Sequence, residues 1–258
     1  MPTVATPGAT IYYETHGAGP ALVLAHGAGG NRISWWQQVP HFARTFRLIV
    51  LDHRGFGRST CAEGDFRPAR FPDDLAAVLD AESISRAALV CQSMGGWTGL
   101  PFALSQPERV AALVLCATPG GLWNDEVARG VRETNARIAA ARIDHTPALG
   151  AAFARRRPDM RHLYDQIGAL NAISLQSLAR LFEPEVRIAP ARLAGHRVPT
   201  LVLSGSDDLL FPPEVMRSVA RDIPGAALES FDGAGHSIYF EMPERFNAAV
   251  GEFLAKHP

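Results

Sequence analysis

The chain has 258 residues, of which 47% are hydrophobic and 20% charged, enough to bury one sizeable core in a single α/β domain with an insertion. The formal net charge of -1 leaves no basic field that would attract nucleic acid or anionic lipid, so both are excluded as partners. The three cysteines show no C-x-x-C spacing and no leader or membrane-length apolar run is visible, so we expect a cytoplasmic protein.

Short apolar runs alternate with helical patterns along the first half of the chain. Ala9–Thr15 is rich in β-branched and aromatic residues and is predicted to form an edge hairpin strand. The continuous apolar runs Ala21–Ala25 and Arg47–Leu51 are typical of parallel strands covered on both faces, with a helix-like stretch over Ser34–Ala43 between them. Phe71–Glu82 is predicted to be an amphipathic helix with an acidic first turn.

A serine follows the next apolar strand, Ala87–Val90, and stands directly before a helical segment over Trp97–Ser105. A serine on a sharp strand-to-helix turn presents its hydroxyl near the positive end of the helix. Small residues flank such a turn because neighbouring Cβ atoms would collide in it. Gly95 fits this pattern, whereas Cys91 occupies a position that usually holds glycine. Ser93 is therefore a candidate nucleophile.

The strand signal disappears after Val110–Cys116 and returns only near residue 200. Helical patches fill the interval, namely Val127–Ala141, Ala148–Arg156, Arg161–Leu170 and Leu175–Phe182. The chain then alternates again, with strands predicted over Thr200–Leu203 and Ala227–Phe231 and helices over Pro213–Ile223 and Glu244–Ala255. We expect an α/β fold with a mostly parallel central sheet and flanking helices, built from residues 1–121 and 198–258, and a helical lid inserted over 122–197.

Three chemically important side chains come just after predicted strands: Ser93, an aspartate at 207 or 208, and His236. The carboxyl ends of parallel strands share one edge, where ligands of open α/β sheets bind. A serine hydroxyl needs a histidine to take its proton, and the histidine needs a carboxylate to fix its tautomer. The order of the three residues along the chain is that of the α/β-hydrolases.

The chain resembles the α/β-hydrolase fold superfamily over its whole length, in its serine esterase and meta-cleavage-hydrolase branch. The motifs that carry the resemblance are His26-Gly27-Ala28-Gly29-Gly30, Asp52-x-Arg54-Gly55-x-Gly57-x-Ser59, Gln92-Ser93-Met94-Gly95-Gly96, Gly205-x-x-Asp208-x-x-x-Pro212 and Gly235-His236. The resemblance implies that Ser93 is the nucleophile, His236 the base and Asp208 the orienting acid.

The neighbouring acidic residues receive structural interpretations. Asp207 is interpreted as a capping residue, because the acid of this motif falls three residues after Gly205. Some relatives use an acid at the position of Asp125, which we interpret instead as the N-cap of the first lid helix.

The resemblance also implies an oxyanion hole made of the backbone N–H groups of Ala28 and Met94. His26 is predicted to pin the glycine loop, and His53 to brace the turn at Asp52. The sequence predicts neither a metal site nor a cofactor.

The substrate pocket is the least determined part of the site. Trp36, Trp97 and Trp123 are each either core residues or walls of this pocket, and the sequence leaves both roles open. The apolar composition of the lid favours small, mostly apolar substrates. Oligomeric state also stays open.

The leading hypothesis is hydrolysis of carboxylic esters or lactones through an acyl-Ser93 intermediate. A serine at the turn argues against haloalkane dehalogenase and epoxide hydrolase chemistry, which needs a carboxylate there. The alternatives are C–C bond hydrolysis of the meta-cleavage type, although the Ser-Gly-Pro-Gly loop of those enzymes is absent, and a slow-turnover ligand sensor that retains the triad. Cofactor-free haloperoxidase or perhydrolase activity is a side reaction of similar sites.

Overall fold

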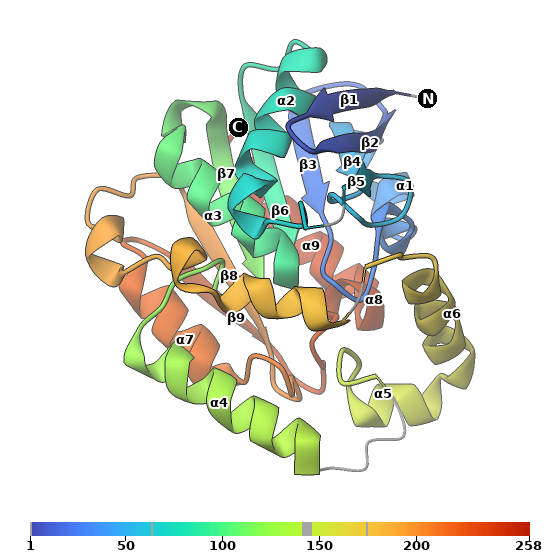
Figure 1. The fold of residues 1–258 in the computed structure, drawn as a ribbon, viewed down its shortest axis with the longest axis vertical. Coiled ribbons are helices and arrows are strands. Elements are labelled where there is room, and N and C mark those ends of the chain that lie inside the picture. The colour runs from blue at the N-terminus through green and yellow to red at the C-terminus, as the bar shows by residue number, and fades with distance from the viewer. Residues whose placement is uncertain (1, 63, 141–145, 174) are drawn as a thin grey trace.

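Nine strands form a single sheet within residues 2–62, 64–140, 146–173 and 175–258, which the computed structural model describes (Figure 1). Their order across the sheet is β1-β2-β4-β3-β6-β7-β8-β9, and β5 pairs with β2 beside this path. The strands are β1 Thr3–Thr6, β2 Ala9–His16, β3 Ala21–Ala25, β4 Arg47–Leu51, β5 Thr60–Cys61, β6 Ala87–Gln92, β7 Val110–Cys116, β8 Thr200–Gly205 and β9 Ala227–Phe231.

The sheet is mostly parallel, as the sequence predicts. Neighbouring strands run parallel from β4 across the sheet to β9, whereas β2 runs antiparallel to its neighbours β1, β4 and β5. The prediction of an edge strand over Ala9–Thr15 is wrong, because this segment lies between β1 and β4. The edge strand at this end of the sheet is Thr3–Thr6, which is short and carries no large apolar side chain, so its pattern gives little strand signal.

Both faces of the sheet are covered, which explains why its central strands are continuous apolar runs. Leu89 and Cys91 of β6 point to one face, where they join the apolar cluster of α2 Phe71–Ala81, α3 Gly96–Ser105 and α7 Pro213–Asp222. Ala88 and Val90 point to the opposite face, into the cluster formed with η1 Arg32–Trp35, α1 Val39–Phe42, α8 Ile238–Glu241 and α9 Pro243–Ala255. Short 3₁₀ turns complete the core at η2 Pro68–Arg70, η3 Ser93–Gly95 and η4 Pro107–Arg109.

The structure has two short helices, η1 and α1, where the sequence predicts one helix over Ser34–Ala43. The Asn31 side chain accepts a hydrogen bond from the Ile33 N–H at 3.0 Å and starts η1 earlier than expected. Pro40 lies in the first turn of α1, where its missing N–H is tolerated, whereas it would interrupt a continuous helix.

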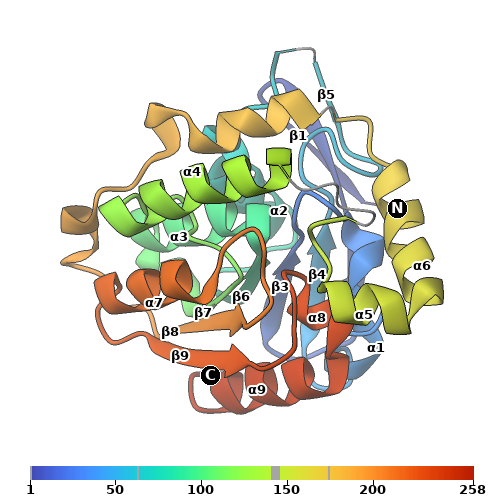
Figure 2. The same cartoon turned by 90° about the horizontal axis from the view of Figure 1, so that it is seen from below.

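A group of helices separates β7 from β8, where the lid is predicted. Its members are α4 Asp125–Ala140, α5 Ala151–Arg156, α6 Pro158–Ala169, η5 Leu175–Phe182, η6 Pro184–Val186 and η7 Pro190–Leu193. Seen from below, α4, α5, α6 and the yellow-orange η5 surround the end of the molecule toward which the strand arrows point (Figure 2). We call residues 122–197 the inserted helices; residue 141, the predicted end of the first of them, lies outside the described residues.

The N-cap of α4 differs from the prediction by one residue. The Asn124 side chain accepts a hydrogen bond from the Val127 N–H at 2.7 Å, so Asn124 caps the helix and Asp125 is its first residue. Among the described helices, none combines the length and the apolar character needed to cross a bilayer.

Candidate active site

Ser93 stands on a strained turn between β6 and the short helix η3. Its φ of 49° lies in the left-handed region, which a residue with a side chain rarely adopts. Two glycines make room for this turn. A Cβ atom at Gly27 would lie 2.9 Å from the Ser93 Cβ, and one at Gly95 would overlap the Ala25 carbonyl oxygen. The turn leaves Ser93 half-buried between a buried Gln92 and a buried Met94.

Cys91 stands where related motifs have glycine, and its side chain fits because the facing residue of α3 is a glycine. Its Sγ atom occupies the space into which a Cβ at Gly99 of α3 would project. The small residue required for strand and helix to approach each other is therefore supplied by Gly99. Burial raises the pKa of the Cys91 thiol, so it stays protonated and takes no part in nucleophilic chemistry.

Asp208 and His236 form a buried hydrogen-bonded pair at the ends of β8 and β9. His236 Nδ1 lies 2.9 Å from Asp208 Oδ2 and 3.1 Å from Oδ1. The Oδ1 atom also accepts the backbone N–H groups of Leu210 at 2.7 Å and Phe211 at 3.0 Å. Because an ionised carboxylate only accepts hydrogen bonds, His236 Nδ1 carries its proton and Nε2 keeps a lone pair.

The second ring nitrogen of His236, Nε2, is the candidate base. His236 Nε2 is buried and has no hydrogen-bond partner among the described residues. Gln92, the residue before Ser93, donates from Nε2 to the His236 carbonyl oxygen at 3.3 Å and joins the two turns directly. The Phe211 ring, whose centroid lies 5.8 Å from the imidazole centroid, lines one cavity together with Ser93.

The capping role predicted for Asp207 is wrong. Its exposed carboxylate accepts a hydrogen bond from the Ser206 hydroxyl at 2.8 Å. The helix that follows, α7, has Pro212 in its N-cap position and no side-chain cap. The residue of this turn that bonds to His236 is therefore Asp208 and not Asp207.

The glycine loop is held by His26, as predicted. Its Nδ1 donates to the Gly27 carbonyl oxygen at 2.8 Å, and its Nε2 accepts the His53 N–H at 3.0 Å. These bonds hold the loop at Gly27, the residue before Ala28. The other candidate oxyanion donor, Met94, lies in the first turn of η3, where N–H groups have no partner within the helix.

His26 and His53 are fully buried neutral imidazoles, which makes the fold sensitive to acid. Burial lowers the pKa of His26, and it lowers that of His53 further with help from the neighbouring His26. In the unfolded chain both take up a proton near about pH 6.5, whereas the folded protein keeps them neutral to lower pH. The unfolded state thus binds more protons below this pH, so acidification favours unfolding.

We expect the free energy of unfolding to fall below about pH 6.5 by at most about 1.4 kcal/mol per pH unit for each of these histidines. Urea unfolding at about pH 7.5 and about pH 5.5 measures this slope. His53→Gln, which can keep the bond from Nε2 to Thr98 (2.8 Å in the native protein), should reduce it. His162→Gln, at an exposed position of α6, should not; equal slopes in all three proteins would contradict the prediction.

The cavity beside Ser93 has a volume of about 180 Å³ and is mostly apolar. Besides Ser93 it is lined by Met94, Trp97, Val131, Thr134, Asn135, Leu178, Leu181, Phe182, Leu210 and Phe211. A second cavity, of about 230 Å³, lies on the Ala28 side and is lined also by Gly29, Tyr164 and Asp165; Leu178 contributes to both. Ser93 lines only the first of these two cavities.

Of the three candidate pocket tryptophans, only Trp97 lines the cavity that contains Ser93. Trp36 is 44% exposed at the end of η1. Trp123 packs against Phe182, with centroids 6.3 Å apart, and under the Arg187 guanidinium, whose central carbon lies 4.1 Å from the ring centroid. Neither Trp36 nor Trp123 lines this cavity, so a part for them in substrate binding stays a prediction.

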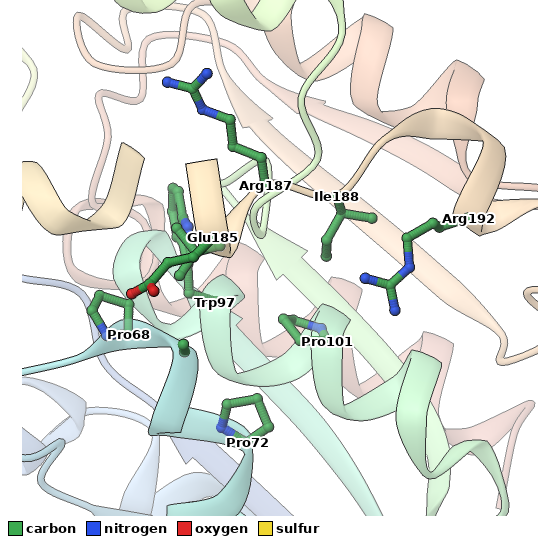
Figure 3. A pocket seen from close by; sticks show the side chains of 10 residues that line it. Pro68, Pro72, Trp97, Pro101, Glu185, Arg187, Ile188 and Arg192 are labelled. Atoms are coloured by element: carbon green, nitrogen blue, oxygen red, sulfur yellow. The ribbon is translucent and has the colours of Figure 1, made fainter. Parts of the chain in front are cut away.

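A further cavity, of about 130 Å³, shares the wall formed by Trp97 (Figure 3). Figure 3 shows Pro68 and Pro72 on one side of it and Arg187, Ile188 and Arg192 on the other. Ser93 is not among the residues that line it, so we do not assign the reaction to this cavity.

Sequence reasoning missed several polar residues around His236. Gln92 binds its carbonyl, Ser237 donates to the Tyr164 hydroxyl at 3.0 Å, and Glu241 accepts the Gly235 N–H at 2.9 Å. The sequence marks Gln92 and Glu241 only as polar residues at the end of an apolar segment, in Ala-Leu-Val-Cys-Gln and Ile-Tyr-Phe-Glu.

Among the described residues, no group of three histidine, cysteine or acidic side chains could hold a metal ion.

Comparison with known proteins places this geometry in a family. The model of the alpha/beta hydrolase fold family matches residues 20–243. The putative carbamate hydrolase RutD of Azorhizobium caulinodans is 30% identical over 99% of both chains. The 2-hydroxy-6-oxononadienedioate/2-hydroxy-6-oxononatrienedioate hydrolase of Burkholderia vietnamiensis is 32% identical over 95% of this chain and 91% of its own. A thermophilic esterase from Thermogutta terrifontis superposes with a TM-score of 0.82 at 30% identity, covering 99% of this chain and 98% of the esterase.

Proposed function

Because this chain belongs to the alpha/beta hydrolase fold family, we propose that it is a serine hydrolase that cleaves carboxylic esters or lactones through an acyl-Ser93 intermediate. The observation that carries the proposal is the strained Ser93 turn, joined through Gln92 to a histidine whose other side is bonded to a buried carboxylate. The mostly apolar cavity beside Ser93 supports small, mostly apolar acyl groups as substrates.

The proposed reaction uses the lone pair of His236 first as a base. His236 Nε2 takes the proton of the Ser93 hydroxyl while Oγ bonds to the carbonyl carbon of the substrate. The imidazolium is stabilised by Asp208, and it then gives the proton to the departing alkoxide as the ester C–O bond breaks. Water, deprotonated by the same nitrogen, attacks the acyl-Ser93 and releases the carboxylic acid and the free serine.

The carbonyl oxygen becomes negative in each tetrahedral intermediate. We assign its stabilisation to the backbone N–H groups of Ala28 and Met94, one on the glycine loop and one at the start of η3. The positive end of η3 and α3 supports the same charge. Loss of one such donor typically lowers kcat by about 10²–10³.

The experiment that tests the proposal is hydrolysis of p-nitrophenyl esters from acetyl to decanoyl, followed by release of nitrophenolate. Acid quenching during turnover, followed by mass spectrometry, should show the protein heavier by one acyl group on the peptide that contains Ser93. Release at the rate of buffer alone, with no acylated peptide, would contradict the proposal.

Phe182→Ala is expected to shift the preferred acyl chain to greater length. The Phe182 ring packs between Trp97 and Trp123, with centroid distances of 5.7 Å and 6.3 Å, and closes the apolar cavity. Each additional methylene buried in the enlarged space contributes about 0.8 kcal/mol, or about fourfold in kcat/KM. Phe253→Ala, in the cluster on the other face of the sheet, is the matched control and should leave the chain-length profile unchanged. An identical profile for Phe182→Ala and wild type would show that this cavity does not hold the acyl chain.

A second candidate is hydrolysis of a C–C bond of the meta-cleavage type, because the relative from Burkholderia vietnamiensis is named as a hydrolase of the oxo acids 2-hydroxy-6-oxononadienedioate and 2-hydroxy-6-oxononatrienedioate. Loss of the yellow colour of a vinylogous diketone substrate measures this activity. Faster turnover of that substrate than of any ester would favour the second candidate. A slow-turnover sensor would instead show a stable acylated Ser93 and turn over neither substrate.

A further inference from the structure

The residues on either side of His236 are both fastened to the inserted helices. On one side, the Gly235 N–H donates to Glu241 Oε2 at 2.9 Å, while Glu241 Oε1 accepts the Gly150 N–H at 3.2 Å. Gly150 directly precedes α5. On the other side, the Ser237 hydroxyl donates to the hydroxyl oxygen of Tyr164 in α6 at 3.0 Å. The residues directly before and after His236 are thus both linked to the segment that contains α5 and α6, while His236 itself is bonded to Gln92 and Asp208.

The backbones of Gly150 and Gly235 touch each other. A Cβ atom at Gly235 would overlap the Gly150 backbone nitrogen. A Cβ at Gly150 would lie 2.9 Å from Glu241 Oε2 and 3.1 Å from the Gly235 nitrogen. Glycine at both positions lets one carboxylate reach two N–H groups that are far apart in sequence. The contact is therefore specific to this arrangement of the two segments.

Glu241 is a buried carboxylate, only 9% exposed, and forms no ion pair among the described residues. Burial raises the pKa of its carboxyl group, and the charge of the nearby Asp208 acts in the same direction. Backbone N–H groups of Gly235, Gly150 and Ser237 oppose that shift. Burying a carboxylate costs free energy, which the hydrogen bonds from these backbone N–H groups offset. The same bonds join the His236 turn to the residue before α5, and this link accounts for an acid at a buried position.

We propose that Glu241 is a positioning residue for the base: its carboxylate clamps the His236 turn to Gly150 at the start of α5 and so places His236 for proton transfer. The inference rests on the proposed function for the role of His236. It adds that the inserted helices, besides shaping the substrate cavity, are part of the support of the catalytic base.

Glu241→Gln tests this inference with little change of shape. The amide has one accepting oxygen, so its NH₂ group must face either the Gly235 or the Gly150 N–H, and one of the two bonds is lost. We expect kcat to fall about 10–100-fold, as it does when a hydrogen-bond partner that orients a metal-ligating histidine is removed. KM should stay near the wild-type value, because Glu241 lines neither of the cavities beside Ser93 and Ala28. Glu244→Gln, exposed and three residues further along, is the matched control.

Gly150→Ala approaches the same clamp from the inserted helices. Its added Cβ would press on both Glu241 and Gly235, so it should reproduce the loss of kcat although it touches no triad residue. Thermal unfolding of each variant identifies any that fails to fold. If Glu241→Gln does so, Gly150→Ala decides the question.

A readout that needs no substrate is the low-field proton resonance of the His236 Nδ1–H, which is bonded to Asp208. In Glu241→Gln and Gly150→Ala this resonance should shift or broaden, and in Glu244→Gln it should not. Wild-type kcat and an unchanged resonance in both clamp variants would overturn the inference, as would a change confined to KM. Wild type without Ser93-dependent hydrolysis would contradict the proposed function instead, and the resonance would still decide the role of Glu241.

Discussion

Ser93→Ala is expected to lower kcat for p-nitrophenyl ester hydrolysis by about 10⁶, the loss typical when a serine hydrolase loses its nucleophile. The variant has no hydroxyl to form the acyl intermediate, while the bond between His236 and Asp208 remains intact. Steady-state kinetics of the two proteins, purified in the same way, measure the effect. Activity within about tenfold of wild type would exclude Ser93 as the nucleophile.

Replacement of Ser93 should also separate activity from stability. Alanine at this position keeps the strained φ of 49°, whereas glycine adopts it without steric cost. We expect Ser93→Gly to be as inactive as Ser93→Ala but more stable, by about 1 kcal/mol after the greater flexibility of glycine in the unfolded chain is subtracted. Urea unfolding of the three proteins checks this. Equal stability of the glycine and alanine variants would show that the turn stores no strain.

Asp208→Asn is expected to lower kcat by about 10⁴, with a small effect on KM. An asparagine can donate toward the imidazole and favours the tautomer with the proton on Nε2, which cannot take the Ser93 proton. Its remaining carbonyl oxygen can still accept the N–H groups of Leu210 and Phe211, so the turn should keep its shape.

Two control variants make the result for Asp208 specific. Asp207→Asn removes the same charge one residue earlier, at an exposed side chain, and should leave kcat within about twofold of wild type. Asp125→Asn should also be active, because Asp125 lies in the first turn of α4. An active Asp208→Asn beside an inactive Asp125→Asn would move the acid to the other position.

Much of the fold could be predicted from the sequence because its signals are local. The strands Ala21–Ala25, Arg47–Leu51, Val110–Cys116 and Ala227–Phe231 have the bounds that their patterns predict. A buried parallel strand consists of consecutive apolar residues, and the turn after it contains glycine or polar residues, so both ends are marked within a few positions. The ends of the strands can also be read from the sequence, so Ser93, Asp208 and His236 are each predicted to follow a strand. A parallel sheet brings the residues that follow its strands to one edge.

Features that depend on distant contacts were decided only by the tertiary structure. Thr3–Thr6 is a strand because β2 offers it an edge, and Trp97, rather than Trp36 or Trp123, lines the cavity because of where α3 packs. Glu241 meets the Gly150 N–H across 91 residues of sequence. No local pattern encodes that meeting, because it exists only once the sheet has placed the His236 turn against the inserted helices. The sequence by itself determined which residues are candidates for the chemistry, because each follows a local strand pattern. The packing of distant segments decided which residues hold these candidates in place.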